Sequence, residues 1–406
     1  MHILLIHQAF ASLKEGGGTR HYEMARYLSQ SGHRVTIIAS PISYLSGKAN
    51  KKIRWKEVEF ASPEITIIRA FTYKALHRSF FHRMINFFSF MFSSFFIGLR
   101  IPGVDLVWGT SPPIFQGVTA WALSKLKKVP FLFEVRDLWP QFAVDIGVLK
   151  NKLVITASEW LERVLYSHSD LTVVNSPGFV DHVMRNGARI VELVPNGVDT
   201  NMFDPHDKGK LFRHKYHLED KFIVLYAGAH GMANDLDTIL ESANILRDDE
   251  EIVFTLIGDG KEKPNLIEKA KSMQLSNVLF LPVFPKTEIP EALAAANACI
   301  AILKPIESFK TTYPNKVFDY MAAGRPTILA IDGVIREVVE IAQAGITVQP
   351  GNPHQIAEAV HTLVNNPEKS VIMGMNGRNH VEKYYDRAQL TQKFVAILES
   401  LRNADG

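Results

Sequence analysis

Cysteine is almost missing from this chain of 406 residues: the single one, Cys299, lies in the apolar run "ALAAANACIAIL". One thiol cannot build a disulfide framework, so the composition favours a reducing compartment. The first residues, "MHILLIHQAF", have neither a basic start nor a small-residue cleavage site, which indicates a strand rather than a signal peptide. We therefore expect a cytoplasmic protein.

The motifs of several enzyme classes are missing too. No cluster of His and Cys has zinc spacing, there is no Gly-x-Ser-x-Gly elbow, and the absence of a G-x-G-x-x-G fingerprint disfavours a nicotinamide dehydrogenase. Asp235 and Asp237 spell Asp-x-Asp, but a helix cap at Asn234 or Asp235 with Asp237 in the first turn explains the pattern better than a metal. We expect no metal and no other cofactor.

No long hydrophobic run is available to cross a membrane. The stretch 84–99, "MINFFSFMFSSFFIGL", has sixteen uncharged residues, whereas a spanning helix needs about 20. Asn86, Ser89 and Ser93 form a polar stripe on it at helical spacing. Two interpretations stay open: a core helix packed on a sheet, or an interfacial helix that rests on anionic lipid.

The net charge of +3 hides an asymmetry between the two halves of the chain. Residues 1–200 carry 23 Lys and Arg against 15 Asp and Glu, whereas residues 201–406 carry 22 against 27. Residues 48–83 alone hold nine Lys and Arg and only three Glu. This excess adjoins the apolar stretch 84–99, so we expect the 48–99 region to meet a membrane surface, and we expect no nucleic-acid partner.

Strand-like and helix-like segments alternate throughout, which is typical of parallel sheets covered on both faces. Apolar runs recur at 2–7, 33–40, 104–110, 130–137 and 170–176, and again at 221–228, 251–260, 277–283, 298–303 and 326–331. Pro, Asn, Gly and Asp interrupt both the strand-like and the helix-like periodicity at 194–205, which predicts a boundary between two domains there. The sequence predicts an α/β fold of two doubly wound, Rossmann-like domains, with ligands beyond the carboxyl ends of the strands.

Three glycine loops follow predicted strands. The first is Gly16, Gly17 and Gly18, the second holds Gly228 and Gly231, and the third holds Gly258 beside Asp259. Open backbone amides at a helix N-terminus favour phosphate, although a run of glycines can also be merely a flexible loop.

Polar residues also end two strands of the first half. His7 ends "LLIH", and Arg136 and Asp137 lie in "FEVRDLWP". If these strand ends face a cleft, His7, Arg136 and Asp137 are candidates for one functional site. The alternative is a structural Arg136–Asp137 pair and a histidine satisfied within its turn.

The stretch "TTYPNKVFDYMAAGRP" places Lys316 three residues before Asp319, at the start of a predicted helix. A cation and an anion one turn apart can pair with each other. They can instead hold different parts of one ligand.

Taken together, Gly16–Gly18, "VRDLWP", "VPNGVDTNMF", "IGDG" and "PNKVFDYMAAGRP" resemble family 4 retaining glycosyltransferases of the GT-B fold. More narrowly, the chain resembles the bacterial O-antigen and capsule L-fucosamine-transferase-like group. The resemblance implies an acceptor-binding domain at 1–200, a nucleotide-sugar-binding domain at 201–385 and a final helix, 386–406, that crosses back to the first domain. The two domains would face a central cleft.

The resemblance also assigns roles to the residues quoted above. Lys316 would hold the donor diphosphate and Asp319 the nucleotide ribose, with Thr311, Thr312 and Asn315 beside them. Arg20 and the glycine loops would assist with the diphosphate, and His7, Arg136 and Asp137 would join Lys316 in catalysis.

Three departures from the family pattern concern the donor. Thr311 occupies the position of the first acid of a Glu-x7-Glu motif, the second acid is Asp319, and "GAHGMAND" lacks the usual Arg and Lys. Glu307 is near the first position but out of register.

The activity that the resemblance implies is hexosyl transfer (EC 2.4) with retention. The donor would be a nucleotide-sugar, UDP-linked and carrying an N-acetylated amino- or deoxyamino-sugar. The acceptor would be a polyprenyl-diphosphate-linked saccharide at the inner face of the cell membrane, in surface polysaccharide synthesis. Two alternatives are a nucleotide-sugar 2-epimerase of related fold, which needs no acceptor, and a non-catalytic nucleotide-sugar-binding protein.

Overall fold

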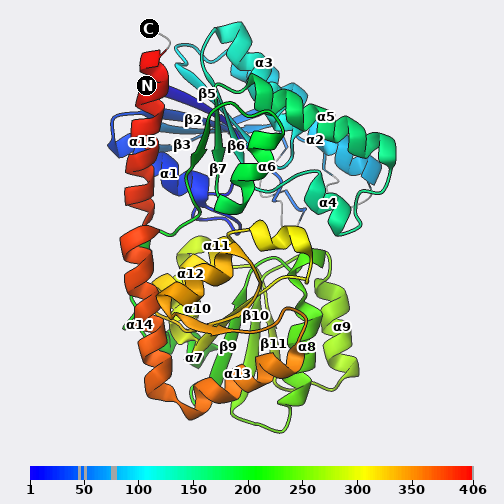
Figure 1. Cartoon of the computed structure of the whole chain (residues 1–406), viewed down its shortest axis with the longest axis vertical. Helices are drawn as coiled ribbons and strands as arrows, with labels where there is room; N and C mark the ends of the chain where they lie inside the picture. Colours follow the sequence, from blue (N-terminus) through cyan, green and yellow to red (C-terminus); the bar gives the residue numbers. More distant parts are fainter. Residues whose placement is uncertain (44–46, 50–52, 75–79, 405–406) are drawn as a thin grey trace. The chain divides into compact units, whose positions relative to one another are not determined.

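A computed structural model describes residues 1–43, 47–49, 53–74 and 80–404, which form two compact units (Figure 1). Unit 1 comprises Met1–Ser12, Gly18–Pro195 and Ala388–Gly406, and unit 2 comprises Leu13–Gly17 and Asn196–Arg387. The chain thus leaves unit 1 after Pro195, ahead of the boundary expected at residue 200. Lys51, Lys52 and Arg78 of the basic segment lie outside the described residues.

Unit 1 is built on an eight-stranded sheet of order β3-β4-β2-β1-β5-β6-β7-β8. All of its neighbouring strands are parallel except β3 and β4, which form an antiparallel pair at one edge. The central strands are buried along their whole length, which is why they read as continuous apolar runs. The strands are β1 (His2–Ile6), β2 (Arg34–Ala39), β3 (Lys56–Ser62), β4 (Ile65–Ala70), β5 (Leu106–Ser111), β6 (Phe131–Val135), β7 (Leu171–Val174) and β8 (Val191–Leu193).

Helices cover both faces of this sheet with separate apolar cores. One core joins the sheet to α2 (Phe80–Leu99), α3 (Phe115–Lys127), α5 (Lys152–His168) and α6 (Val180–Arg185). The other joins it to α1 (Arg20–Gln30) and to α15 (Arg387–Ala404), drawn in red beside α1 in Figure 1. The short α4 (Gln141–Asp145) follows β6. The side chain of Phe394 on α15 is fully buried, with its ring centroid 5.1 Å from that of Trp108.

Unit 2 has an all-parallel, six-stranded sheet of order β11-β10-β9-β12-β13-β14. The strands are β9 (Phe222–Ala227), β10 (Ile252–Ile257), β11 (Val278–Leu281), β12 (Ala298–Ile302), β13 (Thr327–Ala330) and β14 (Gly345–Thr347). One face packs on α8 (Leu236–Ile245), α9 (Lys263–Ser272) and α13 (Pro353–Asn365). The other packs on α7 (Lys210–Lys215), α10 (Ile289–Ala295), α11 (Asn315–Ala322), α12 (Val334–Ala342) and α14 (Pro367–Tyr384).

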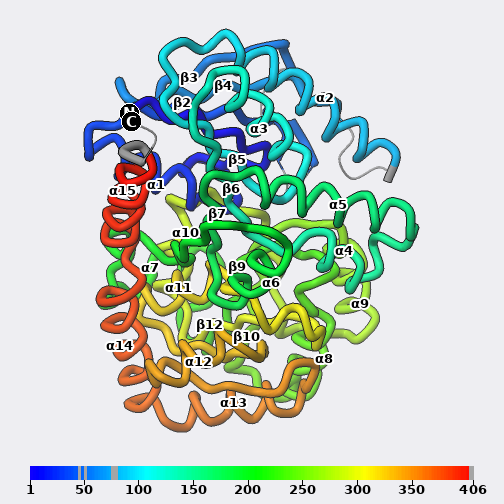
Figure 2. Tube along the Cα trace, turned by 45° about the horizontal axis from the view of Figure 1, so that its top comes forward, coloured from blue at the N-terminus to red at the C-terminus, as the bar shows by residue number. Residues whose placement is uncertain are grey.

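Helix α2 has the reverse of the usual polarity of a surface helix. It packs along α3 (Figure 2), and its polar stripe faces inward: the Asn86 amide donates to the Tyr73 carbonyl oxygen at 2.6 Å, and the Ser93 hydroxyl donates to that of Phe71, also at 2.6 Å. Phe81, Phe88 and Phe92 instead point outward, with 71%, 46% and 60% of their side chains exposed. The packed face agrees with the core interpretation of this stretch, while contact with lipid stays a prediction for the uncovered aromatic face.

Within the part of the chain that the structure describes, no helix is long and apolar enough to span a membrane.

Candidate functional site

In unit 2 the loops that follow β9 and β10 pack against each other through glycines. A Cβ atom on Gly258 would lie 1.9 Å from the carbonyl oxygen of Gly228, and Gly258 has a φ of +151°. Any side chain at this position would therefore break the contact and strain the backbone. Gly231, farther along the first loop, has open space around it, with the Asn234 amide 3.6 Å from a Cβ built there.

Lys316, at the start of α11, reaches over this loop. Its Nζ donates to the Tyr226 hydroxyl at 2.7 Å and to Asn234 Oδ1 at 3.3 Å, and lies 4.0 Å from the centroid of the Tyr226 ring. A Cβ atom on Gly228 would come within 2.7 Å of the same Nζ. The glycine therefore makes room for the cation, and the two residues form one cradle.

The charge of Lys316 is not neutralised by the protein. Lys316 forms no ion pair with any carboxylate among the described residues, and burial lowers the pKa of its ammonium to about 7. A desolvated cation without a counter-ion costs free energy, and an anionic ligand would remove that cost. The cradle is thus suited to a negatively charged group.

Asp319 does not pair with Lys316. Its Oδ2 accepts from Lys286 Nζ at 2.6 Å, in a pair whose side chains are 16% and 11% exposed. Lys286 also lies 5.4 Å from the centroid of the Phe203 ring. The cation and the anion at the start of α11 thus have separate partners and do not pair with each other.

Among the residues just before Lys316, Asn315 leaves a polar atom open. The Asn315 Oδ1 is buried without a hydrogen-bond partner among the described residues. The hydroxyls of Thr311 and Thr312 donate to the carbonyl oxygens of Ser308 and Phe309, at 2.6 and 2.8 Å. Glu307 pairs with Lys310 in an exposed salt bridge at 2.6 Å, so it does not replace the missing first acid.

Two residues of this region were not anticipated from the sequence. His230 is fully buried beside the second loop, and neither ring nitrogen has a partner among the described residues. Burial, with Lys263 and Lys316 nearby, lowers its pKa to about 4, so the ring is neutral. Lys263 Nζ donates to the carbonyl oxygens of Gly258 and Leu281 at 2.7 and 2.6 Å, and thereby fixes the third glycine loop. In that loop Asp259 Oδ1 accepts from the amide of Gly260 at 2.8 Å.

Unit 1 brings His7 and Arg136 together at the carboxyl ends of β1 and β6. Arg136 Nη1 lies 3.2 Å from His7 Nε2, and His7 Nδ1 lies 2.8 Å from the hydroxyl oxygen of Thr110. Burial, with His21 and Arg136 close by, holds the pKa of His7 well below its usual range. A neutral His7 therefore accepts from Arg136 and donates to Thr110, and this orients the guanidinium.

Asp137 directly follows Arg136 and is partly buried. Burial raises the pKa of its carboxyl to about 6, although the adjacent Arg136 acts in the opposite direction. No side-chain ion pair joins Asp137 to Arg136 among the described residues. The simple structural pair considered from the sequence is therefore not formed.

Arg20 has an internal role that the sequence did not suggest. Its Nε donates to Glu134 Oε1 at 2.9 Å, and its Nη1 and Nη2 donate to the carbonyl oxygens of Pro195 and Val194, each at 2.7 Å. Glu134 is completely buried and also meets His21 Nε2 at 2.6 Å. Arg20 is 2% exposed, so the expected contribution of this residue to diphosphate binding finds no support in the structure.

The first glycine loop divides between the units. Gly16 and Gly17 group with unit 2, where a Cβ atom on Gly16 would lie 2.4 Å from the Val283 side chain, while Gly18 belongs to unit 1, near the Arg136 guanidinium. Close packing thus explains Gly16 without any ligand.

The Asp-x-Asp pair has separate protein partners. Asp235 Oδ2 accepts from the Thr238 hydroxyl at 2.8 Å, and Asp237 Oδ1 pairs with Lys269 at 2.8 Å. Among the described residues no group of three or more His, Cys, Asp or Glu could hold a metal ion.

Two family models match this chain in succession. Residues 15–197 match the glycosyl transferase 4-like domain, and residues 207–380 match glycosyl transferases group 1. A protein of Escherichia coli (strain K12) named as the colanic acid biosynthesis glycosyl transferase WcaI is 23% identical over 92% of this chain and 93% of its own.

Solved structures share the fold over nearly the whole chain. Sucrose-phosphate synthase from Thermosynechococcus elongatus matches with a TM-score of 0.78 and 19% identity, over 99% of both chains. Anabaena HepE in complex with UDP-glucose matches with a TM-score of 0.71 and 17% identity, over 98% of this chain and 100% of that one. The predicted GT-B fold is confirmed. With both domain models matched in order and the fold shared from end to end, the chain is a glycosyltransferase of the GT-B type.

Proposed function

We propose that this glycosyltransferase moves a sugar from a UDP-linked donor to a lipid-linked saccharide, with retention of anomeric configuration, in the synthesis of a surface polysaccharide. The expected sugar is an N-acetylated amino- or deoxyamino-sugar. The observation that carries the proposal is the Lys316 cradle: a desolvated ammonium without a carboxylate partner, held over glycine loops at the carboxyl ends of β9 and β10.

The diphosphate of the donor would supply the missing negative charge. Lys316 would meet phosphate oxygens, and the backbone amides at the start of α11 would face the same group. Asp319, held by Lys286 at 2.6 Å, is rigid enough to accept hydrogen bonds from a ribose. HepE, of the same fold, was solved with UDP-glucose, which supports a uridine nucleotide here.

Transfer would proceed at the front face of the donor sugar. In that scheme the leaving diphosphate takes the acceptor proton, and the protein stabilises the charge that develops on it. Retention itself is proposed from the family resemblance.

The acceptor would bind to residues of unit 1. Arg136, held by neutral His7, is a fixed cation suited to a phosphate or a carboxylate of the acceptor. Asp137, with its pKa raised to about 6, lies beside it. The uncovered aromatic face of α2, with the exposed Trp55 and Lys56 near Phe92 and Arg100, would rest on anionic lipid at the inner face of the membrane. The colanic acid name of the E. coli relative agrees with surface polysaccharide synthesis.

The experiment is a transfer assay with radiolabelled UDP-sugars and polyprenyl-diphosphate-linked saccharides, without added metal. We expect label to enter the lipid fraction and to need the lipid-linked acceptor. We expect Lys316→Ala to lower turnover about 100-fold or more, and by a larger factor than it weakens donor binding. If the donor sugar is epimerised in the absence of any acceptor, the protein is a 2-epimerase instead. If only soluble acceptors are glycosylated efficiently, the proposal of a lipid-linked acceptor is wrong.

A further inference from the structure

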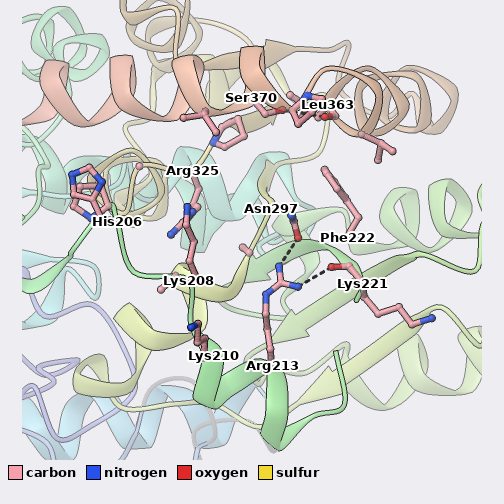
Figure 3. Close-up of a pocket in the computed structure, with 18 of the residues that line it drawn as sticks. His206, Lys208, Lys210, Arg213, Lys221, Phe222, Asn297, Arg325, Leu363 and Ser370 are labelled. Carbon is pink, nitrogen blue, oxygen red and sulfur yellow. Dashed lines mark hydrogen bonds between the residues drawn. The ribbon is translucent and has the colours of Figure 1, made fainter. Parts of the chain in front are cut away.

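A cavity in unit 2 lies at the amino ends of the strands, whereas Lys316 lies near their carboxyl ends. It measures about 920 Å³ and opens at the amino ends of the strands, where Phe222 begins β9, Asn297 precedes β12 and Pro326 precedes β13 (Figure 3). Because these strands are parallel, this edge is distinct from the one that holds the candidate donor site.

Cations gather around this cavity. Five basic side chains line it, against three acidic ones: Lys208, Lys210, Arg213, Lys221 and Arg325 against Glu219, Asp220 and Glu251. Figure 3 shows Arg213 and Arg325 pointing into the same space. Burial lowers the pKa of Arg213, and the nearby charge of Arg325 lowers it further.

The bonds of Arg213 explain it as a structural residue. Its two Nη atoms donate to four backbone carbonyl oxygens and to Asn297 Oδ1, at 2.6 to 3.2 Å. These bonds tie the loop before β9 to the end of α10. Arg213 therefore contributes positive charge to the cavity, but its Nη atoms are already hydrogen-bonded and are not free to bind a ligand.

Arg325 is bonded less completely. It is 8% exposed, its Nε donates to the Leu293 carbonyl oxygen at 3.1 Å and its Nη2 donates to that of Asp207, while Nη1 has no hydrogen-bond partner among the described residues. The carboxylates of Asp204 and Asp207 are near, but they accept from the backbone amides of His206 and Gly209 at 2.9 Å. One guanidinium nitrogen of this largely buried residue thus remains available at the cavity wall.

The rest of the lining divides into a charged end and an apolar wall. Lys208 and Lys210 are exposed and form no ion pair with described residues, so their ammonium groups are free to meet a ligand near Arg325. The wall is formed by Phe222, Leu363, Val364, Pro367, Val371 and Met375. Such a cavity matches a ligand with an anionic head and an apolar body.

We propose that this cavity is a second binding site, separate from the donor site, for an amphipathic phosphate-bearing molecule. The phosphate group would sit on Arg325, Lys208 and Lys210, and the apolar part would lie against Phe222 and α14. The proposal does not depend on the transferase chemistry, because it uses none of the residues of the Lys316 cradle.

The test is isothermal titration of the full-length protein with 1-naphthyl phosphate, and with inorganic phosphate as the probe that lacks an apolar body. We expect the naphthyl ester to bind more tightly than inorganic phosphate. Lys208→Ala with Lys210→Ala should weaken its binding by about tenfold, since two charge-assisted contacts are lost. Arg325→Gln should do the same, provided that circular dichroism shows it folded.

Two controls distinguish this site from others. Lys316→Ala should leave naphthyl phosphate binding within twofold of wild type, and so should Lys271→Ala with Lys393→Ala, a pair of exposed lysines that do not line the cavity. Absence of binding at millimolar probe would overturn the proposal. So would equal losses in the two double-lysine variants, or loss only in Lys316→Ala, which would place the phosphate in the donor cradle.

Discussion

At the residue scale, Lys316 is the group whose chemistry departs most from its surroundings. Its ammonium is held by a hydroxyl, an amide oxygen and an aromatic ring rather than by a carboxylate. Each of these partners is neutral, so none of them offsets the charge of Lys316 when the lysine is protonated. Gly228 and Gly258 keep the space above the loop clear of side chains.

Binding of UDP should therefore take up a proton. Burial lowers the pKa of Lys316 to about 7, so most of the lysine is neutral at pH 8 in the free protein, and a bound diphosphate would restore its charge. Calorimetry at pH 8 in two buffers of different ionisation enthalpy should show uptake of close to one proton. The uptake should vanish in Lys316→Ala. Equal uptake by both proteins would contradict the assignment.

The lowered pKa of Lys316 also makes the stability of the fold depend on pH. A buried lysine whose pKa is lowered in the native state destabilises the fold while it is charged. The loss of folding free energy is therefore full below about pH 7, the native pKa, and becomes smaller as the pH rises toward the ordinary lysine pKa of 10.5. Without ligand, Lys316→Met should have a higher melting temperature than wild type at pH 6, with the difference shrinking above pH 9. A difference that does not change with pH would attribute the effect to packing alone.

Arg20 offers a contrasting test, because its contacts are structural. Arg20→Ala would leave the buried Glu134 without one of its cations and should lower the free energy of unfolding by about 3–5 kcal/mol. In the folded fraction we expect unchanged affinity for UDP. If denaturant unfolding showed little change while UDP binding fell, Arg20 would be a donor ligand after all.

The site residues differ in how far the sequence alone could predict them. Lys316 and Asp319 were found because a local motif carries them, and both lie where strand ends converge. The pairing of Asp319 with Lys286 and of Arg20 with Glu134 could not be found in the same way. These partners are 33 and 114 residues apart, so only the three-dimensional fold brings them together.

At the scale of elements, the strand pattern predicted the sheets well, because buried parallel strands read as apolar runs. The strands β3 and β4 were not anticipated. The edge strand, β3, alternates partly exposed and exposed positions rather than forming a continuous apolar run. The sequence of α2 correctly showed a polar stripe. It could not show that this stripe satisfies the backbone of residues 71–73 and so turns the phenylalanines outward.

The uncovered face of α2 leads to a membrane-binding prediction. Phe88→Ser with Phe92→Ser should lower partition onto phosphatidylglycerol vesicles by about tenfold or more, because each exposed ring would otherwise bury apolar area in lipid. Co-sedimentation measures the bound fraction. The matched control is Leu211→Ser with Ile341→Ser, which removes two exposed apolar side chains of unit 2.

Failure of the wild-type protein to bind anionic vesicles would contradict the membrane role of α2. Equal losses in the two double variants would show that general surface apolarity, rather than this helix, drives binding.

At the scale of the whole molecule, unit 1 is discontinuous along the chain. Its last segment, Ala388–Gly406, returns after all of unit 2 and fills the core beside α1 with Phe394 and Leu398. The return of the final helix was expected from the family resemblance, not from periodicity, which gives no tertiary partner for a helix.

Phe394→Ala should therefore destabilise unit 1 while sparing the donor site. Loss of a fully buried aromatic ring costs about 3–5 kcal/mol. Denaturant unfolding followed by tryptophan fluorescence should report the loss, because Trp108 lies against Phe394. UDP affinity should stay within twofold of wild type, as in the control Lys393→Ala. A parallel fall in UDP affinity would show that the donor site depends on the unit 1 core.

The donor site is tested most directly by calorimetric binding of UDP, GDP and ADP, without added metal, to the wild-type protein, to Lys316→Ala and to Lys271→Ala. We expect UDP to bind in preference to GDP and ADP, Lys316→Ala to weaken UDP binding by about tenfold or more, and Lys271→Ala to leave it unchanged. Binding of none of the three nucleotides, or equal UDP binding by all three proteins, would contradict the Lys316 cradle as the donor site.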